Sequence, residues 1–166
     1  MAILVSIPIL GILVLLESAI FSQVRLLYGS IDLVLLTLVA WAVQERVKTA
    51  WHWGLVAGLL VGVVSAVPMP AIVLGYLLAT GAALLFKRVF WQRPFLAMIA
   101  ATFAATLITH ALAFSALRFT GTAIPLVESV NLVTLPSALL NLLLAIPVYA
   151  LVGDLANSLY PEVIEI

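Results

Sequence analysis

The chain has 166 residues, of which 66% are hydrophobic and only 8% are charged, and its formal net charge is zero. Soluble domains carry roughly 45–50% apolar and about 25% charged residues, so this surplus of apolar side chains cannot be buried within a domain of this size and must face lipid. The zero net charge gives no electrostatic basis for binding nucleic acid. The absence of cysteine excludes disulfides, thiolate metal ligands and thiol nucleophiles.

Six apolar segments follow one another along the chain, and we interpret each as a membrane-spanning helix, which needs about 20 predominantly apolar residues. Most charged residues lie at the ends of these segments. The sequence therefore predicts a single all-α membrane domain over residues 1–166. The six predicted spans cover residues 2–21, 27–43, 51–67, 71–86, 94–117 and 135–160.

The basic residues predict the orientation of these spans. The connections after the second and fourth spans carry five of them, namely Arg46, Lys48, Lys87, Arg88 and Arg93. The other connections carry two, Arg25 and Arg118. Cytoplasmic connections are enriched in Lys and Arg, so we expect both termini in the cytoplasm and a multi-pass protein of the cytoplasmic (inner) membrane. Trp51 and Trp53, at the start of the third span, are predicted interfacial anchors.

The third predicted span carries a ridge of small residues. Gly54, Gly58 and Gly62 are spaced by four, and Ser65 extends the ridge before Pro68 ends the helix. Residues four apart share one face of a helix, and small residues there let two helices approach closely in lipid. We expect a helical hairpin at this point, with the ridge packed on another helix or on a partner protein.

Two later spans carry further candidates for helix packing. Gly75 and Ala79 form a smaller ridge on the fourth span. Asn141 lies in the middle of the sixth span, where an amide is expected to join helices through hydrogen bonds.

Four ionisable residues are candidates for a functional role because such groups are rare within membrane spans, namely Glu17, Asp32, His110 and Arg118. Glu17 lies near the outer end of the first span and could be protonated, snorkel to the interface, or pair with Arg25 or Arg118. Asp32 suits the N-terminal turn of the second span. His110 lies inside the fifth span, either as a functional group or as an internal hydrogen-bonding partner of nearby threonines.

The chain lacks the motifs of common enzyme classes. It contains no phosphate-binding glycine loop with a lysine, no His-Glu-x-x-His and no Gly-x-Ser-x-Gly sequence. We therefore expect a protein that is not an enzyme and needs no cofactor or metal.

Three stretches, at residues 30–33, 58–70 and 139–149, resemble the MreD family of rod-shape-determining membrane proteins. The sequence SIDL at Ser30–Leu33 stands where the family opens its second span with Pro-Asp-Leu. Residues 58–70, GLLVGVVSAVPMP, are similar to the family stretch Gly-Leu-Leu-x-Asp-Leu-x-Ser-Gly-x-Pro-Leu-Gly, with Gly62 in place of the aspartate. Residues 139–149, LLNLLLAIPVY, resemble the last span of the family, with its Asn and its Pro-x-Tyr.

The resemblance implies a non-enzymatic scaffold of the bacterial cell-elongation machinery that helps to organise peptidoglycan synthesis. Its direct partner would be MreC, a single-span periplasmic protein. MreB, RodA and a class B penicillin-binding protein would belong to the wider complex. The family is also similar in architecture to the S-components of energy-coupling-factor vitamin transporters, which have six helices.

An S-component is accordingly the alternative function. It would need a solute cavity near the outer face, lined by polar groups. It would also use a ridge of small residues, such as the one at Gly75 and Ala79, to dock on its transport scaffold. The residues available for such a cavity are Glu17, Ser18, Gln23, Arg25, Arg118, Glu128 and Asn131.

Overall fold

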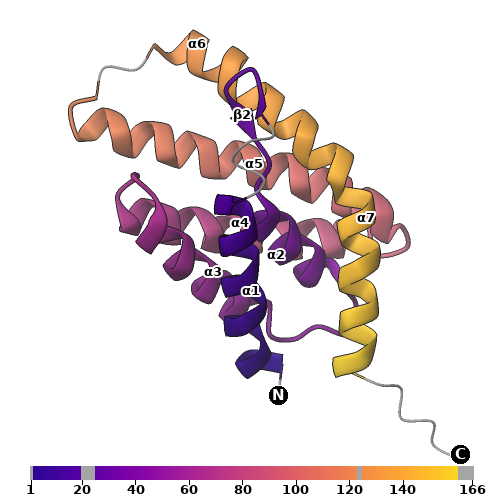
Figure 1. Cartoon of the computed structure of the whole chain (residues 1–166). Helices are drawn as coiled ribbons and strands as arrows, with labels where there is room; N and C mark the ends of the chain where they lie inside the picture. Colours follow the sequence, from indigo (N-terminus) through magenta and orange to yellow (C-terminus); the bar gives the residue numbers. More distant parts are fainter. Residues whose placement is uncertain (1, 20–24, 123–124, 161–166) are drawn as a thin grey trace, which may run out of the picture.

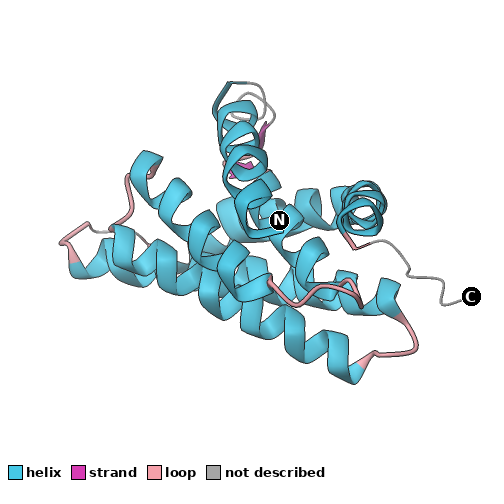
Figure 2. Cartoon of the chain, turned by 90° about the horizontal axis from the view of Figure 1, so that it is seen from below, coloured by secondary structure: helices cyan, strands magenta, loops and turns pink. Residues whose placement is uncertain are grey.

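The computed structural model describes residues 2–19, 25–122 and 125–160 (Figure 1). Six helices of 11 residues or more make up most of this part of the chain, and short loops connect them (Figure 2). The elements are α1 (Ala2–Ala19), β1 (Arg25–Leu26), β2 (Gly29–Ser30), α2 (Leu33–Val43), α3 (Ala50–Val64), α4 (Met69–Val89), α5 (Pro94–Phe119), α6 (Leu126–Ser129), a π-helix (Val130–Thr134) and α7 (Leu135–Leu159).

Helix α2 forms the centre of the bundle. All of its residues are buried, as expected for a helix that is apolar on every side. Helices α4, α5 and α7 pack around it, α3 packs against α4, and α1 packs against both α2 and α3. Figure 1 shows α1 in front of α2, with α7 along the other side of the bundle.

The second predicted span is wrong over its first part. A helix was expected over residues 27–43, but the chain forms a β-hairpin at Arg25–Ser30, with Arg25 opposite Ser30, before α2 begins at Leu33. Leu27 in the turn has a φ of +58°. Helix α2 is therefore only about 16 Å long, against roughly 30 Å for the hydrocarbon core of a bilayer. The hairpin forms because its backbone N–H groups bond to the last helix.

Three helices are long and apolar enough to cross a membrane. They are α4, α5 and the continuous helical stretch Leu126–Leu159, whereas α1, α2 and α3 are shorter apolar helices. The protein thus has the helical composition of a membrane protein, and the crossing of the bilayer by all six helices stays a prediction.

Several predicted boundaries shift. Helix α3 ends at Val64 because Ser65 adopts extended backbone, and α4 already begins at Met69 and continues to Val89. Helix α5 continues to Phe119. The connection expected over residues 118–134 is largely helical, since α6 and the π-helix lead directly into α7.

The connections rich in basic residues gather at one end of the bundle. Lys87, near the end of α4, donates hydrogen bonds to the main-chain oxygens of Gln44 and Glu45, between α2 and α3. Thr49 lies 3.2 Å from the hydroxyl of Tyr160, just after α7. The grouping is compatible with the predicted cytoplasmic side, which stays a prediction.

One predicted interfacial anchor is wrong. Trp53 is fully buried and stacks on Trp41 of α2, with ring centroids 4.2 Å apart. Trp51 and Trp91 are exposed. Because α3 crosses α2 at this point, the indole of Trp53 fills the helix contact instead of the membrane interface.

Candidate functional site

Buried polar side chains from several helices meet near the first residue of α2, and we call this cluster the polar junction. Tyr76 of α4, Thr106 of α5 and Asn141 of α7 are each at most 2% exposed there. Asp32 precedes α2, and Glu17 comes from the last turn of α1. Polar groups inside a membrane bundle are costly and mark candidate sites, so the junction is the candidate functional site.

Asp32 holds the first turn of α2 and binds α4. One carboxylate oxygen accepts a hydrogen bond from the backbone N–H of Leu35 at 2.7 Å, which caps the helix. The hydroxyl of Tyr76 donates to the carboxylate and lies 3.0 Å from each of its oxygens. The carboxylate therefore satisfies a free N–H group at the helix terminus and ties α4 to α2.

Asn141 connects three helices through one side chain. Its Oδ1 accepts the backbone N–H of Asp32 at 3.0 Å, and its Nδ2 donates to Oγ1 of Thr106 at 3.1 Å. The Thr106 hydroxyl in turn donates to the carbonyl of Thr102, four residues earlier on α5. The amide therefore fixes α7 against both α2 and α5.

The carboxyl group of Glu17 lies beside the same helix start. The carboxyl group lies near the backbone N–H groups of Leu33 and Val34 and near the carboxyl group of Asp32. Its Oε2 atom is buried without a hydrogen-bond partner among the described residues. The first turn of α2 thus receives two carboxyl groups, one from Asp32 and one from α1.

The β-hairpin completes the junction on the side of α7. Alternate backbone N–H groups of the extended chain face the last helix, so that Tyr28 donates to the Leu132 carbonyl at 3.1 Å and Ser30 donates to the hydroxyl of Ser137 at 3.0 Å. In an α-helix the donor to the Leu132 carbonyl would be residue 136, and Pro136 has no N–H. The proline therefore removes one competitor of Tyr28 for this carbonyl.

The same contact requires glycine in the second strand. A Cβ atom on Gly29 would lie 2.6 Å from the backbone nitrogen of Ser137 and 2.7 Å from Cβ of Pro136. No side chain fits between the hairpin and α7, so the close approach that permits these hydrogen bonds depends on Gly29.

The predicted glycine ridge packs inside the protein, against α4. A Cβ atom on Gly58 would lie 2.9 Å from the Cα of Val73, and one on Gly62 would lie 2.8 Å from Cγ of Met69. Gly54 directly faces Thr80. We call this contact the glycine seam. It joins α3 and α4 into the hairpin that the sequence predicted, and it leaves these glycines no free surface for another protein.

The other residues predicted for packing surround the seam. Ser65 ends α3 and accepts a hydrogen bond from the N–H of Val67, and Pro68 precedes α4. On the opposite face of α4, Gly75 approaches Thr109 of α5, and Ala79 is fully buried. These residues build the turn between α3 and α4 and the contact between α4 and α5.

His110 lies apart from the polar junction, at a groove between α5 and the last helix. Its Nδ1 is 3.2 Å from Oγ1 of Thr134, at the end of the π-helix. The groove has a volume of about 440 Å³ and is mainly apolar, with walls that include Leu107, Phe114 and Val130. The sequence suggested threonines within α5 as partners of this histidine, whereas the structure supplies one from the π-helix.

Arg118 also lies apart from the polar junction. It is exposed in the last turn of α5, and it forms no ion pair with Glu17 among the described residues. The side chain of Arg25, the other partner considered for Glu17, lies outside the described residues. The structure therefore brings together Glu17, Asp32 and Asn141, and it separates them from His110 and Arg118.

The sequence did not indicate three members of the polar junction. Tyr76, Thr106 and Ser137 each stand in an apolar run. Thr106 belongs to a series with Thr102 and Thr109 whose spacing marks one helix face, which is a usable signal. Tyr76 gives no local signal, because its partner Asp32 is 44 residues earlier.

The hydrogen bonds of the polar junction connect helices to one another. Within the described residues, the junction side chains form hydrogen bonds to one another and to the backbone, for Asp32, Tyr76, Thr106 and Asn141. In the described part of the chain no three His, Cys, Asp or Glu side chains lie where they could hold a metal ion. The arrangement serves to fix helices in a defined register.

Comparison of the sequence with protein-family models, and of the chain with curated proteins and solved structures, gives no match.

Proposed function

We propose that this protein is a non-enzymatic membrane scaffold of the bacterial cell-elongation machinery, acting as the resemblance to the MreD family implies. The observation that carries the proposal is the use of the intramembrane polar groups. Asn141 and Asp32 bind helices together instead of lining a passage, as a rigid binding platform requires. The resemblance at residues 58–70 and 139–149 supplies the biological setting.

The proposed partner is an MreC-type protein with one membrane helix. The proposed contact face is the groove beside His110, which lies between α5 and the helical residues 126–134. This groove is open and mainly apolar, and His110 with Thr134 gives it a polar pair. Partner helices in membranes associate through close packing with a few interhelical hydrogen bonds. The glycine seam is already occupied by α4, which leaves this groove as the better-suited surface.

The test is co-expression of the full chain with an MreC-type partner, followed by affinity capture and photo-crosslinking. A crosslinking residue at Ala111, which lines the groove, is expected to join the two proteins. The matched control is the same residue at Leu78, which is exposed on α4. Capture without any crosslink at Ala111 would place the partner elsewhere. Failure to capture the partner would overturn the proposed scaffold function.

The same preparation tests the alternative. An S-component would retain a vitamin-sized ligand in stoichiometric amount, and native mass spectrometry of the purified chain would detect the added mass. We expect the mass of the chain with bound lipid or detergent only. MreB, RodA and a class B penicillin-binding protein are proposed to join through the wider complex, so they should be captured only when the MreC-type partner is present.

A further inference from the structure

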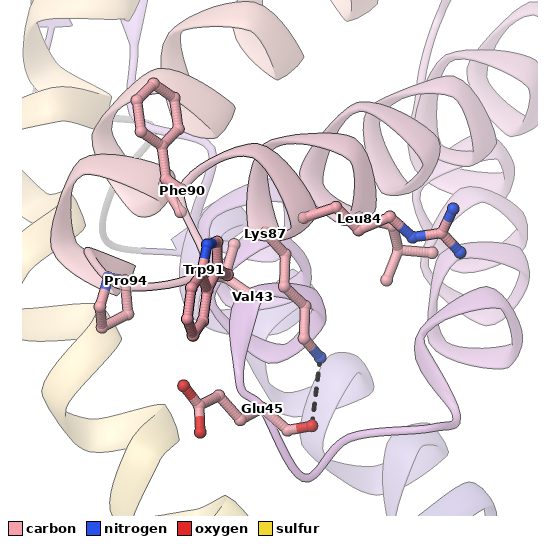
Figure 3. A pocket seen from close by; sticks show the side chains of 9 residues that line it. Val43, Glu45, Leu84, Lys87, Phe90, Trp91 and Pro94 are labelled. Atoms are coloured by element: carbon pink, nitrogen blue, oxygen red, sulfur yellow. Dashed lines mark hydrogen bonds between the residues drawn. The ribbon is translucent and has the colours of Figure 1, made fainter.

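A cleft opens at the end of the bundle opposite the polar junction, between the ends of α2 and α4 and the start of α5. It has a volume of about 520 Å³, within the usual range for small-molecule sites. Val43, Leu84 and Phe90 form apolar walls, and Trp91 flanks them. Figure 3 shows Lys87 reaching toward the main chain at Glu45, with Trp91 beside it and the ring of Phe90 pointing away.

Three charged side chains line this cleft, namely Lys87, Arg88 and Glu45. Lys87 donates to the main-chain oxygens of Gln44 and Glu45, the latter at 3.4 Å, and so caps the C-terminal end of α2. An ammonium group has three donors, so one remains for a ligand.

The carboxylate of Glu45 does not pair with the lysine. It points away from the Lys87 ammonium, toward the side of Trp91 (Figure 3). Within the described residues, neither Glu45 nor Arg88 forms an ion pair. The cleft therefore holds a positive and a negative group that act on one another electrostatically without forming an ion pair, an arrangement that is complementary to a ligand carrying both charges.

The cleft lies at the level where the apolar surface of the bundle ends. Val89 on α4 and Phe95 on α5 are large exposed apolar residues beside it, and Trp91 is 69% exposed. Exposed apolar side chains next to a tryptophan and basic residues are typical of the boundary between hydrocarbon and lipid headgroups. A lipid molecule can therefore reach the cleft with its chains along α4 and α5.

We propose that this cleft binds the headgroup of a phospholipid that carries a phosphate and a primary ammonium group. The phosphate lies at Arg88 and Lys87, and the ammonium group lies at Glu45. Basic pockets between membrane helices are established sites for lipid phosphates. The added carboxylate selects an amino headgroup, because a quaternary amine has no N–H to donate and a glycerol headgroup has no positive charge.

The experiment is native mass spectrometry of the full chain in detergent, titrated with phospholipids of identical acyl chains. We expect phosphatidylethanolamine to bind roughly tenfold more tightly than phosphatidylcholine or phosphatidylglycerol, since one charge-assisted hydrogen bond distinguishes them. Glu45→Gln should abolish this preference while leaving some binding of all three lipids. Arg88→Gln should weaken all three.

Matched controls make the result decisive. Glu128→Gln and Lys48→Gln change exposed charges outside the cleft and should leave the preference unchanged. Soluble phosphoethanolamine at equal concentration should not displace the lipid, because it lacks the chains. Equal retention of the three lipids by the unaltered chain would overturn the proposal. It would also fail if Glu45→Gln strengthened phosphatidylglycerol binding without loss of phosphatidylethanolamine, or if soluble phosphoethanolamine displaced the lipid.

Discussion

The glycine seam and the polar junction hold helices together in opposite ways. At the seam, α3 and α4 approach because Gly58 and Gly62 have no side chains. At the junction, α2, α5 and α7 are joined by directed hydrogen bonds through Asn141 and Asp32. In lipid, apolar burial gives no net drive for helix association, so close packing and hydrogen bonding both contribute. Steric fit and polar pairing are thus divided between two regions of one bundle.

The largest expected effect comes from filling the glycine seam. Gly58→Leu should lower the free energy of unfolding by about 3 kcal/mol, because its side chain has to displace the backbone of α4 at Val73. The measurement is unfolding in mixed detergent micelles, followed by circular dichroism. Gly11→Leu is the matched control, since a Cβ atom there meets nothing within 4 Å. Equal losses for the two variants would remove the seam as a source of stability.

Breaking the polar junction at its centre should have the next largest effect. Asn141→Leu keeps the size of the side chain but leaves the N–H of Asp32 and the hydroxyl of Thr106 without this partner. We expect a loss of about 2 kcal/mol in the same unfolding measurement. Asn131→Leu, at an exposed position of the π-helix, is the control and should change little. If Asn141→Leu leaves the free energy of unfolding unchanged, packing alone fixes α7.

Removal of one hydroxyl should have a smaller effect. Tyr76→Phe deletes the donor to both oxygens of Asp32, while the N–H of Leu35 still binds the carboxylate. We expect a loss of about 1 kcal/mol, since interhelical hydrogen bonds in membranes are individually modest. Tyr28→Phe serves as the control, because Tyr28 is 69% exposed. A loss as large as that of Asn141→Leu would contradict the ranking of the two contacts.

The smallest global effect is expected where the hairpin meets α7. Pro136→Ala supplies an N–H that competes with Tyr28 for the carbonyl of Leu132. Stability should change by less than about 1 kcal/mol, but hydrogen exchange at the amide of Tyr28 should become faster. The control is Pro125→Ala, which precedes α6 away from the hairpin. Unaltered exchange at Tyr28 would mean that the hairpin does not depend on the proline.

Local sequence patterns predicted the parts of the fold that depend on neighbours in the chain. The spacing of Gly54, Gly58 and Gly62 indicated a helix face without bulk, and Pro68 marked the turn after it. Asp32 was expected at a helix N-terminus because its carboxylate can accept the first free N–H groups, and it caps α2 at Leu35. These features depend on contacts within a few residues or across a short turn.

Long-range contacts decided the features that the sequence did not indicate. Residues 27–32 form a hairpin and its exit instead of a helix because their N–H groups find acceptors more than 100 residues away, at Leu132, Ser137 and Asn141. Trp53 was expected at the membrane interface, but it stacks on Trp41 in the core. Local secondary-structure propensity predicts neither outcome, since each depends on which helices become neighbours.

By itself, the sequence determined that the chain is helical and apolar and that it contains a close helical hairpin, because composition and four-residue spacing act locally. Only the tertiary structure decided where the polar groups meet. Glu17, Tyr76 and Asn141 are far apart in the chain, and the packing of α1, α4 and α7 around α2 brings them to Asp32. The physical reason is that a buried polar group must find its partner in space, and helix packing alone sets which partner it finds.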